Sequence, residues 1–279
     1  MIVNKGTSFG WSYEQLANDN SRLGLHLFSV LACIVESWKE DGGLLGKIEQ
    51  GEVQLPPDYK GLVKEACLAL ENDFHGLAIQ VDMLNHIYDN RKNFLRGKDF
   101  LYATEVIEKY FANMRSIYDF MAKVIRLTMN PNHIKQLGGA FDSFNDLIKS
   151  VDKGKHDEKY PERLKELLKN IKDSFYKVRG MRDFIFHNGK QLHVMTKDDG
   201  YYIGLGAFSK EYEWVPVMPY LLEVTREMVE LGEELGILIQ EEYTKRYGKI
   251  PFTYVALEGR CIPSFMDFLN SKVNVEERD

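Results

Sequence analysis

Cysteine is scarce in this 279-residue sequence. There are three cysteines, an odd number, and they lie far apart in the sequence: Cys33, Cys67 and Cys261. This pattern argues against a disulfide framework or a zinc site and fits a reducing cytoplasm. The longest apolar stretch, Leu23 to Val35, covers 13 residues. A membrane span needs about 18–20 residues, so we predict a buried helix there. The N-terminus lacks a signal-peptide pattern, and we therefore expect a cytoplasmic protein with no membrane partner.

Positive charge is not in excess, because 36 Lys and Arg residues stand against 42 Asp and Glu residues, for a net charge of −6. This balance argues against unspecific coating of nucleic acid. The segment from Lys149 to Lys190 differs, with 12 basic and 7 acidic residues. Such a segment could hold an anion, and a solvated helix face with alternating charges explains the same counts equally well.

Proline and glycine are near average, at 8 and 22 residues, which excludes collagen-like and low-complexity designs. Apolar residues instead recur at steps of three and four in long runs, a spacing that predicts amphipathic helices. The prolines at positions 131, 161 and 216 or 219 mark helix boundaries. We expect helices over residues 21–39, 141–151 and 161–187. Three further helices are expected from their apolar stripes: one with its stripe at 63–88, one with its stripe at 100–124 that ends at 130–131, and one that begins at 216 or 219 with its stripe at 224–238.

One part of the sequence favours β structure. Gln191 to Thr196 and Tyr201 to Phe208 flank a Lys-Asp-Asp-Gly turn, which predicts a hairpin at about 191–208. The fold class predicted is therefore mainly all-α, an antiparallel helical bundle with a β-hairpin inserted after the 161–187 helix. We expect residues 1–96 to pack on a helical domain of residues 97–248, followed by a tail of residues 249–279 with a strand-like run at 252–257.

The helix predicted to end near residue 187 has one gap in its apolar pattern, because Val178 is followed by Ile185 seven residues later. Dividing the gap into four plus three places Arg182 on the apolar stripe. A buried guanidinium without partners is costly, so this position predicts an anionic or carbonyl partner. Two interpretations stay open: Arg182 binds an external anion, or it lies near the helix end and reaches solvent or pairs with a carboxylate from a neighbouring helix.

His187 lies five residues after Arg182, beside the helix stop predicted at Asn188-Gly189. On a straight helix the two side chains point about 140° apart. They converge only if the last turn loosens or if a second subunit brings its own copy opposite. The negative end of a helix favours the protonated imidazole and moves its pKa toward 7, which suits a general acid or base. A simple capping role is the alternative.

The run Arg182-Asp183-Phe184-Ile185-Phe186-His187 resembles the Arg-polar-x-x-x-His signature of the HEPN superfamily (higher eukaryotes and prokaryotes nucleotide-binding). The predicted context is also similar, since the motif ends a long helix in an all-helical bundle. The resemblance covers about residues 97–248. It implies a homodimer that juxtaposes two motifs in one cleft. Many members are metal-independent ribonucleases, often toxins or anti-phage effectors.

The resemblance also implies roles for individual residues. Arg182 would hold the scissile phosphate, Asp183 would orient the pair, and His187 would move protons. Because the 2′-hydroxyl of the RNA is itself the nucleophile, the products would carry cyclic phosphate, and no metal or other cofactor is expected. The expected partners are a second copy, an RNA or nucleotide-like ligand, and an antitoxin protein. Further substrate contacts are expected from Arg179, Asn188 and Lys190.

A second hypothesis stays open beside the ribonuclease. Some members carry a tyrosine two residues after the histidine, as the target of nucleotidyl modification by an antitoxin, whereas this sequence has Gly189. Other members have no nuclease activity. The alternative is a non-catalytic, HEPN-like ligand-binding or dimerisation protein, in which Arg182 neutralises a buried carboxylate.

Other polar patterns point less clearly to chemistry. Arg115 and Asp119 lie four residues apart, off the apolar stripe of the 100–124 helix. They could face the motif and support it, or form an exposed ion pair. The Gly204-Leu205-Gly206 run lacks the third glycine of a dinucleotide-binding loop. A helical di-iron site is not expected either, because the sequence has no Glu-x-x-His.

Overall fold

A computed structural model describes residues 2–3, 9–10, 25–36, 47, 49–51, 55, 58–129, 143–154, 160–188, 191–205, 213–248 and 263–271. These parts of the chain are mostly helical, which confirms the mainly all-α prediction. The helices are α2 (Leu25–Glu36), α4 (Tyr59–Asp89), α5 (Asp99–Met129), α6 (Phe144–Asp152), α7 (Glu162–Asn170), α8 (Lys172–Asn188), α9 (Val217–Tyr247) and α10 (Pro263–Asn270).

The long helices follow the apolar spacing of the sequence. Buried side chains at steps of three and four line α4, α5 and α9 along their whole length, and they belong to one continuous core. Helix α6 begins at a serine cap, where the Ser143 hydroxyl accepts the Asp146 amide at 3.2 Å. The helix predicted over 161–187 is instead two helices, because the chain leaves the helical pattern at Ile171.

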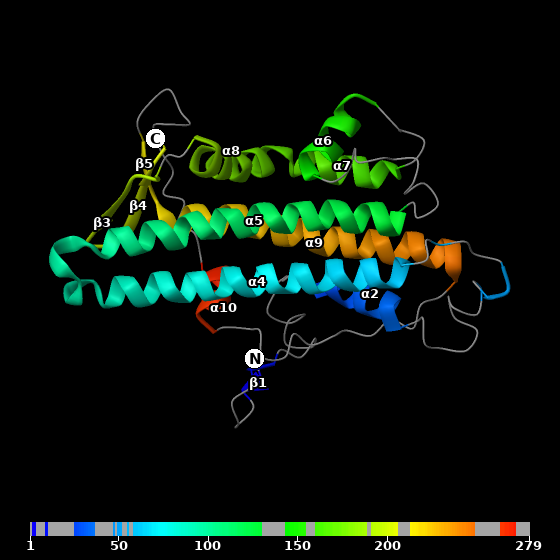
Figure 1. The fold of residues 1–279 in the computed structure, drawn as a ribbon, viewed down its shortest axis with the longest axis horizontal. Coiled ribbons are helices and arrows are strands. Elements are labelled where there is room, and N and C mark those ends of the chain that lie inside the picture. The colour runs from blue at the N-terminus through cyan, green and yellow to red at the C-terminus, as the bar shows by residue number, and fades with distance from the viewer. Residues whose placement is uncertain are drawn as a thin grey trace.

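The helices form three layers in Figure 1. Helices α6, α7 and α8 make the upper layer, α5 and α9 the middle layer, and α4 and α2 the lower layer. Helices α5 and α9 run in one direction, while α4 and α8 run in the opposite one. The middle layer contacts both others, since α5 touches α4 and α8, and α9 touches α2 and α7. The helices of residues 1–96 therefore share the core of the later helices.

The predicted hairpin is present, and it has a third strand. Strands β3 (Val194–Lys197) and β4 (Gly200–Gly204) pair in antiparallel register around the Asp198-Asp199 turn. Strand β5 (Trp214–Pro216) then adds to the other side of β4. The predicted residues 206–208 of the second strand lie outside the described residues. A separate pair, β1 (Ile2–Val3) with β2 (Phe9–Gly10), joins two segments near the N-terminus.

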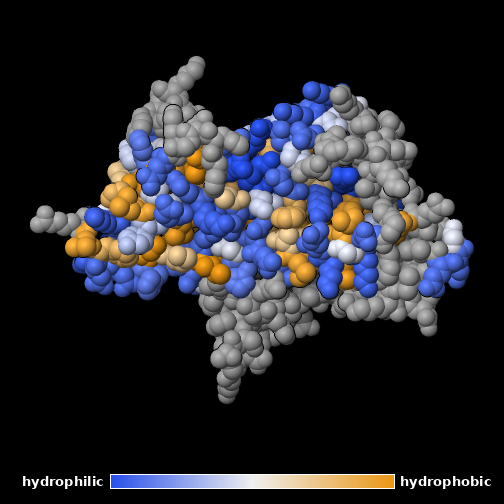
Figure 2. Space-filling view, viewed as in Figure 1, coloured by the Kyte–Doolittle hydropathy of each residue, from blue (hydrophilic) through white to orange (hydrophobic). Residues whose placement is uncertain are grey.

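A buried carboxylate attaches the sheet to the bundle. Asp99, at the first turn of α5, accepts hydrogen bonds from the Thr196 hydroxyl at 2.7 Å and the Tyr201 hydroxyl at 3.2 Å. The sheet thereby sits at the end of the bundle where α5 begins and α8 ends (Figure 1). Figure 2 shows hydrophilic residues over much of the visible face, with hydrophobic residues gathered at the left end. No helix in the described ranges could cross a membrane.

The C-terminal region differs from the prediction in one respect. Helix α10 (Pro263–Asn270) occupies part of the predicted irregular tail and packs on α4 and α9. The Ser264 hydroxyl donates to Asp82 on α4 at 2.8 Å, and Arg226 on α9 donates to the Leu269 carbonyl at 2.7 Å. The strand-like run predicted at 252–257 lies outside the described residues.

Candidate functional site

The core stripe of α8 does not pass through Arg182, so the sequence-based placement of this residue was wrong. The buried residues are Val178, Met181 and Ile185. Met181 divides the gap of seven into three plus four, which fits a helix as well as four plus three does. The side chain of Arg182 is 33% exposed and lies beside the core stripe.

Asp183 holds two arginines at the surface of α8. Its Oδ1 accepts from Nη1 of Arg182 at 3.2 Å, and its Oδ2 accepts from Nε of Arg179 at 3.1 Å. The Asp183 carboxylate is itself 33% exposed, so its ion pair with Arg182 lies at the surface of the helix. Two guanidinium groups around one carboxylate leave this cluster with a net positive charge.

Helix α6 fixes one of the two arginines. The Oδ1 of Asn145 accepts a hydrogen bond from Nη1 of Arg179 and one from the Tyr176 hydroxyl at 3.4 Å. Asn145 is buried, at the second residue of α6. Arg179 therefore has partners on both sides, Asn145 and Asp183, and its position is set by tertiary packing as well as by its own helix.

Arg115 and Asp119 form an ion pair on α5 and face the upper layer. The Arg115 guanidinium lies 5.1 Å from the centre of the Phe175 ring on α8. Asp119 accepts the backbone amide of Phe144, at the start of α6, at 2.8 Å. These two residues thus support α6 and α8 and contact α8 about two turns before Arg182, at Phe175.

The last two residues of the predicted motif, at positions 186 and 187, are described only in their backbone. Helix α8 continues without a break through positions 187 and 188, so the last turn does not loosen within the described helix. The side chains of His187 and Asn188, and the whole of Lys190, lie outside the described residues. Position 187 is one turn beyond Asp183, which places it about 40° around the helix from that carboxylate.

The described side chains can bind an oxyanion. Arginine offers a planar fork of N–H donors that matches phosphate oxygens, and a partly exposed arginine can use it without a large change in structure. Asp183 orients both forks through its two oxygens. The cluster of Arg179, Arg182 and Asp183, which we call the arginine cluster, is therefore a candidate phosphate site on α8.

Sequence reasoning missed Asn145 and Tyr176 as members of this site. Tyr176 lies three residues before Arg179, and this helical spacing was a usable signal. The sequence contains no such signal for Asn145, because this residue contacts Arg179 only through the packing of α6 on α8. Within the described ranges, no group of three or more His, Cys, Asp or Glu side chains could hold a metal ion.

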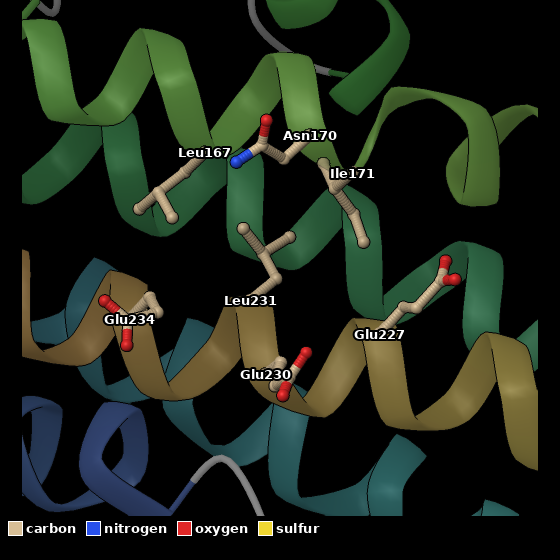
Figure 3. Close-up of a pocket in the computed structure, with 7 residues that line it drawn as sticks. All are labelled: Leu167, Asn170, Ile171, Glu227, Glu230, Leu231 and Glu234. Carbon is tan, nitrogen blue, oxygen red and sulfur yellow. The ribbon is translucent and has the colours of Figure 1, made fainter.

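A pocket of about 330 Å³ lies elsewhere, between α9 and the junction of α7 and α8. Figure 3 shows Leu167, Ile171 and Leu231 facing one another across it, with carboxylates along α9. These carboxylates, on Glu227, Glu230 and Glu234, disfavour a phosphate ligand. Ile171 is eleven residues from Arg182, or about 16 Å along the helix axis, so the pocket is separate from the arginine cluster.

Comparison of this chain with protein-family models, with curated proteins and with solved structures found no match.

Proposed function

We propose that this chain is a metal-independent endoribonuclease of HEPN type that acts as a homodimer through Arg182 and His187. The observation that carries the proposal is the arginine cluster, in which Asp183 presents two guanidinium groups at the surface one turn before position 187 of the same helix. Arg179 and Arg182 would bind the scissile phosphate and stabilise the charge that develops on it.

The proposed reaction uses groups of the RNA and of this chain. The ribose 2′-oxygen attacks the adjacent phosphorus, and the bond from phosphorus to the 5′-oxygen breaks. His187 takes the proton of the 2′-hydroxyl while water gives a proton to the leaving 5′-oxygen, or His187 gives that proton while water takes the proton of the 2′-hydroxyl. The products are a 2′,3′-cyclic phosphate and a 5′-hydroxyl. Because the 140° separation of Arg182 and His187 persists in a regular helix, the two groups would come from different subunits.

The first experiment measures cleavage of RNA by the purified chain in EDTA. We expect fragments with cyclic phosphate ends, and we expect Arg182→Ala and His187→Ala to abolish them. Lys177→Ala is a matched control, because Lys177 is also on α8 and forms an exposed ion pair with Glu223 at 2.7 Å. His86→Ala, an exposed histidine on α4, controls for the loss of an imidazole. Full cleavage by His187→Ala would rule out the proposed mechanism.

Folding of the arginine variant can be checked independently. Arg182 and Asp183 form a partly exposed pair, and such pairs contribute about 0–1 kcal/mol to stability. We therefore expect Arg182→Ala to lower the free energy of unfolding by less than about 1 kcal/mol. A wild-type chain that binds RNA through Arg182 and never cleaves it would favour the non-catalytic ligand-binding alternative.

Mixing two inactive variants tests the shared site. In a heterodimer of Arg182→Ala and His187→Ala chains, one of the two composite sites keeps both groups. Random exchange of subunits should then restore about a quarter of the wild-type activity, because half of the dimers carry one intact site of two. A mixture with no activity, measured on a sample shown to exchange subunits, would contradict a site built from two chains.

A further inference from the structure

The connection between α4 and α5 exposes apolar side chains at one end of the molecule. It consists of two short 3₁₀ turns, Arg91–Asn93 and Leu95–Gly97. Leu95 is 79% exposed and Tyr102 is 57% exposed, and Phe100 and Leu101 on the first turn of α5 are exposed as well. In Figure 1 this connection forms the left end of the bundle, where Figure 2 shows hydrophobic residues. We call residues 91–102 the α4–α5 tip.

The connection between α4 and α5 has a defined structure. The Arg91 guanidinium lies 4.0 Å from the centre of the Tyr88 ring and donates to the Tyr88 carbonyl at 2.9 Å. The rings of Phe94 and Tyr102 lie 5.1 Å apart. Gly97 turns the chain into α5 with a φ of 67°, a conformation that favours glycine. These contacts fix the backbone on both sides of Leu95, whose side chain is 79% exposed.

The charge of the tip is opposite to that of the whole chain. Residues 91–102 contain four basic residues and one acidic residue, whereas the chain carries −6. The acidic residue, Asp99, is buried and bonded to the sheet. Lys92 and Lys98 are exposed beside Leu95. An apolar apex flanked by two lysines is thus present at this end, and the exposed carboxylates of Asp89, Asp198 and Asp199 lie behind it, at the end of α4 and in the β3–β4 turn.

These features favour a lipid surface over the other partners. A stable protein interface buries about 800 Å² and about 20–30 residues on each side, whereas the tip has twelve residues. Single-stranded RNA stacks on aromatic rings, yet the most exposed apolar residue of the tip is Leu95. In a bilayer, aliphatic side chains enter the acyl region, tyrosine lies at the interface, and lysine amines reach the phosphates.

We propose that the α4–α5 tip docks on the surface of an anionic lipid bilayer. Leu95 and Leu101 insert between the headgroups, and Lys92 and Lys98 contact lipid phosphates. The contact is peripheral, and with few inserted side chains it is weak and reversible. It goes beyond the proposed ribonuclease activity, and it departs from the sequence-based expectation of no membrane partner. That expectation considered only membrane spans and leader segments.

The test is sedimentation of the full chain with lipid vesicles. We expect binding to vesicles that contain phosphatidylglycerol and about tenfold weaker binding to vesicles of phosphatidylcholine alone. Leu95→Asp should weaken binding about tenfold or more, because it removes the aliphatic side chain that inserts into the bilayer and adds repulsion from the anionic headgroups. Leu68→Asp is the matched control, since Leu68 is 44% exposed on α4 far from the tip. It should bind as the wild type does.

A second variant tests the charge of the tip. Lys92→Glu combined with Lys98→Glu should reduce binding to anionic vesicles about tenfold or more and leave the low binding to neutral vesicles unchanged. The proposal is overturned if the wild type does not bind anionic vesicles, or if Leu95→Asp and Leu68→Asp behave alike. It is also overturned if Leu95→Asp leaves vesicle binding intact but abolishes RNA binding or dissociates a dimer. RNA cleavage by Leu95→Asp in solution should be unchanged, so the two proposals can fail separately.

Discussion

Asn145 is the residue through which α6 controls the arginine cluster. It is buried, and its single carbonyl oxygen accepts hydrogen bonds from Arg179 and Tyr176. A hydrogen bond to a charged donor contributes more than a neutral one, and its loss leaves the donor to find another partner. The side chain therefore affects both the stability of the α6–α8 contact and the direction of the Arg179 fork.

Replacing Asn145 tests this link. We expect Asn145→Ala to lower the free energy of unfolding by about 1–3 kcal/mol, because two hydrogen bonds are lost at a buried position. Asn145→Asp should retain most of the stability, since a carboxylate can accept from Arg179 and is favourable in the first turn of α6. Urea denaturation of the three proteins measures the difference. Equal stability of all three would show that the bonds to Asn145 contribute nothing.

The sequence identifies each residue of the motif, but it does not show how exposed each side chain is. Both Met181 and Arg182 fit helical spacing between Val178 and Ile185, and the structure buries Met181. Of the two, methionine is the residue that prefers the core, and this preference was available from the sequence. The pairing of Arg182 with Asp183 follows from adjacency, whereas the contact of Arg179 with Asn145 depends on how two helices meet.

At the scale of elements, α2 and α9 cross at unusually close range. Gly236 of α9 lies directly against the backbone at the start of α2. A Cβ at this position would be 2.6 Å from the carbonyl carbon of His26 and 2.8 Å from Cα of Leu27. The absence of a side chain therefore allows this crossing, which the His26 ring also fixes through a 2.8 Å contact with Gln240.

We expect Gly236→Ala to destabilise the protein by about 1–3 kcal/mol, because backbone atoms cannot move aside for the methyl group. Gly76→Ala is the matched control. At position 76 a Cβ would meet the side-chain amide of Asn113, which can rotate away. Alanine also has a helix propensity about 1 kcal/mol more favourable than that of glycine. Thermal unfolding of both variants measures the contrast. A loss for Gly76→Ala equal to that for Gly236→Ala would contradict the close-crossing argument.

The long helices could be predicted from the sequence, whereas strand β5 could not. Apolar spacing over several turns identified α4, α5 and α9, since each buries a stripe along 31 residues. Strand β5 has three residues and exists because it pairs with β4, which no local pattern reveals. Helix α10 begins at Pro263, a residue suited to the first helical turn, so that signal was present.

On the scale of the whole molecule, Glu108 connects the bundle to the chain that leaves the motif helix. Its carboxylate on α5 accepts the backbone amide of Leu192, just before β3, at 2.9 Å. Burial raises the pKa of Glu108, the nearby Glu105 raises it further, and the bond from Leu192 lowers it, with a net upward shift. The folded protein therefore binds the proton of this carboxyl more tightly than the unfolded chain does.

The raised pKa predicts how a variant responds to pH. The stability contributed by protonated Glu108 is present below the unfolded pKa and is lost as pH rises through the folded value. Glu108→Gln has no ionisable group and therefore does not lose stability as the pH rises. The amide oxygen of the glutamine can still accept the hydrogen bond from the Leu192 backbone amide. We expect Glu108→Gln to gain stability relative to the wild type between about pH 4 and pH 7 in urea denaturation. Glu105→Gln, at an exposed position, should show a smaller change, and a gain independent of pH would contradict the argument.

Helices α4, α5 and α9 each contain 31 residues, so each is a rod of about 46 Å that extends along most of the bundle. A cut between residues 96 and 97 would separate two of these rods that lie against each other over their full length. Each fragment would then expose the apolar stripe of its helix along the whole length of that helix. A force applied at the sheet end would therefore act directly on continuous helices that reach toward the opposite end of the bundle.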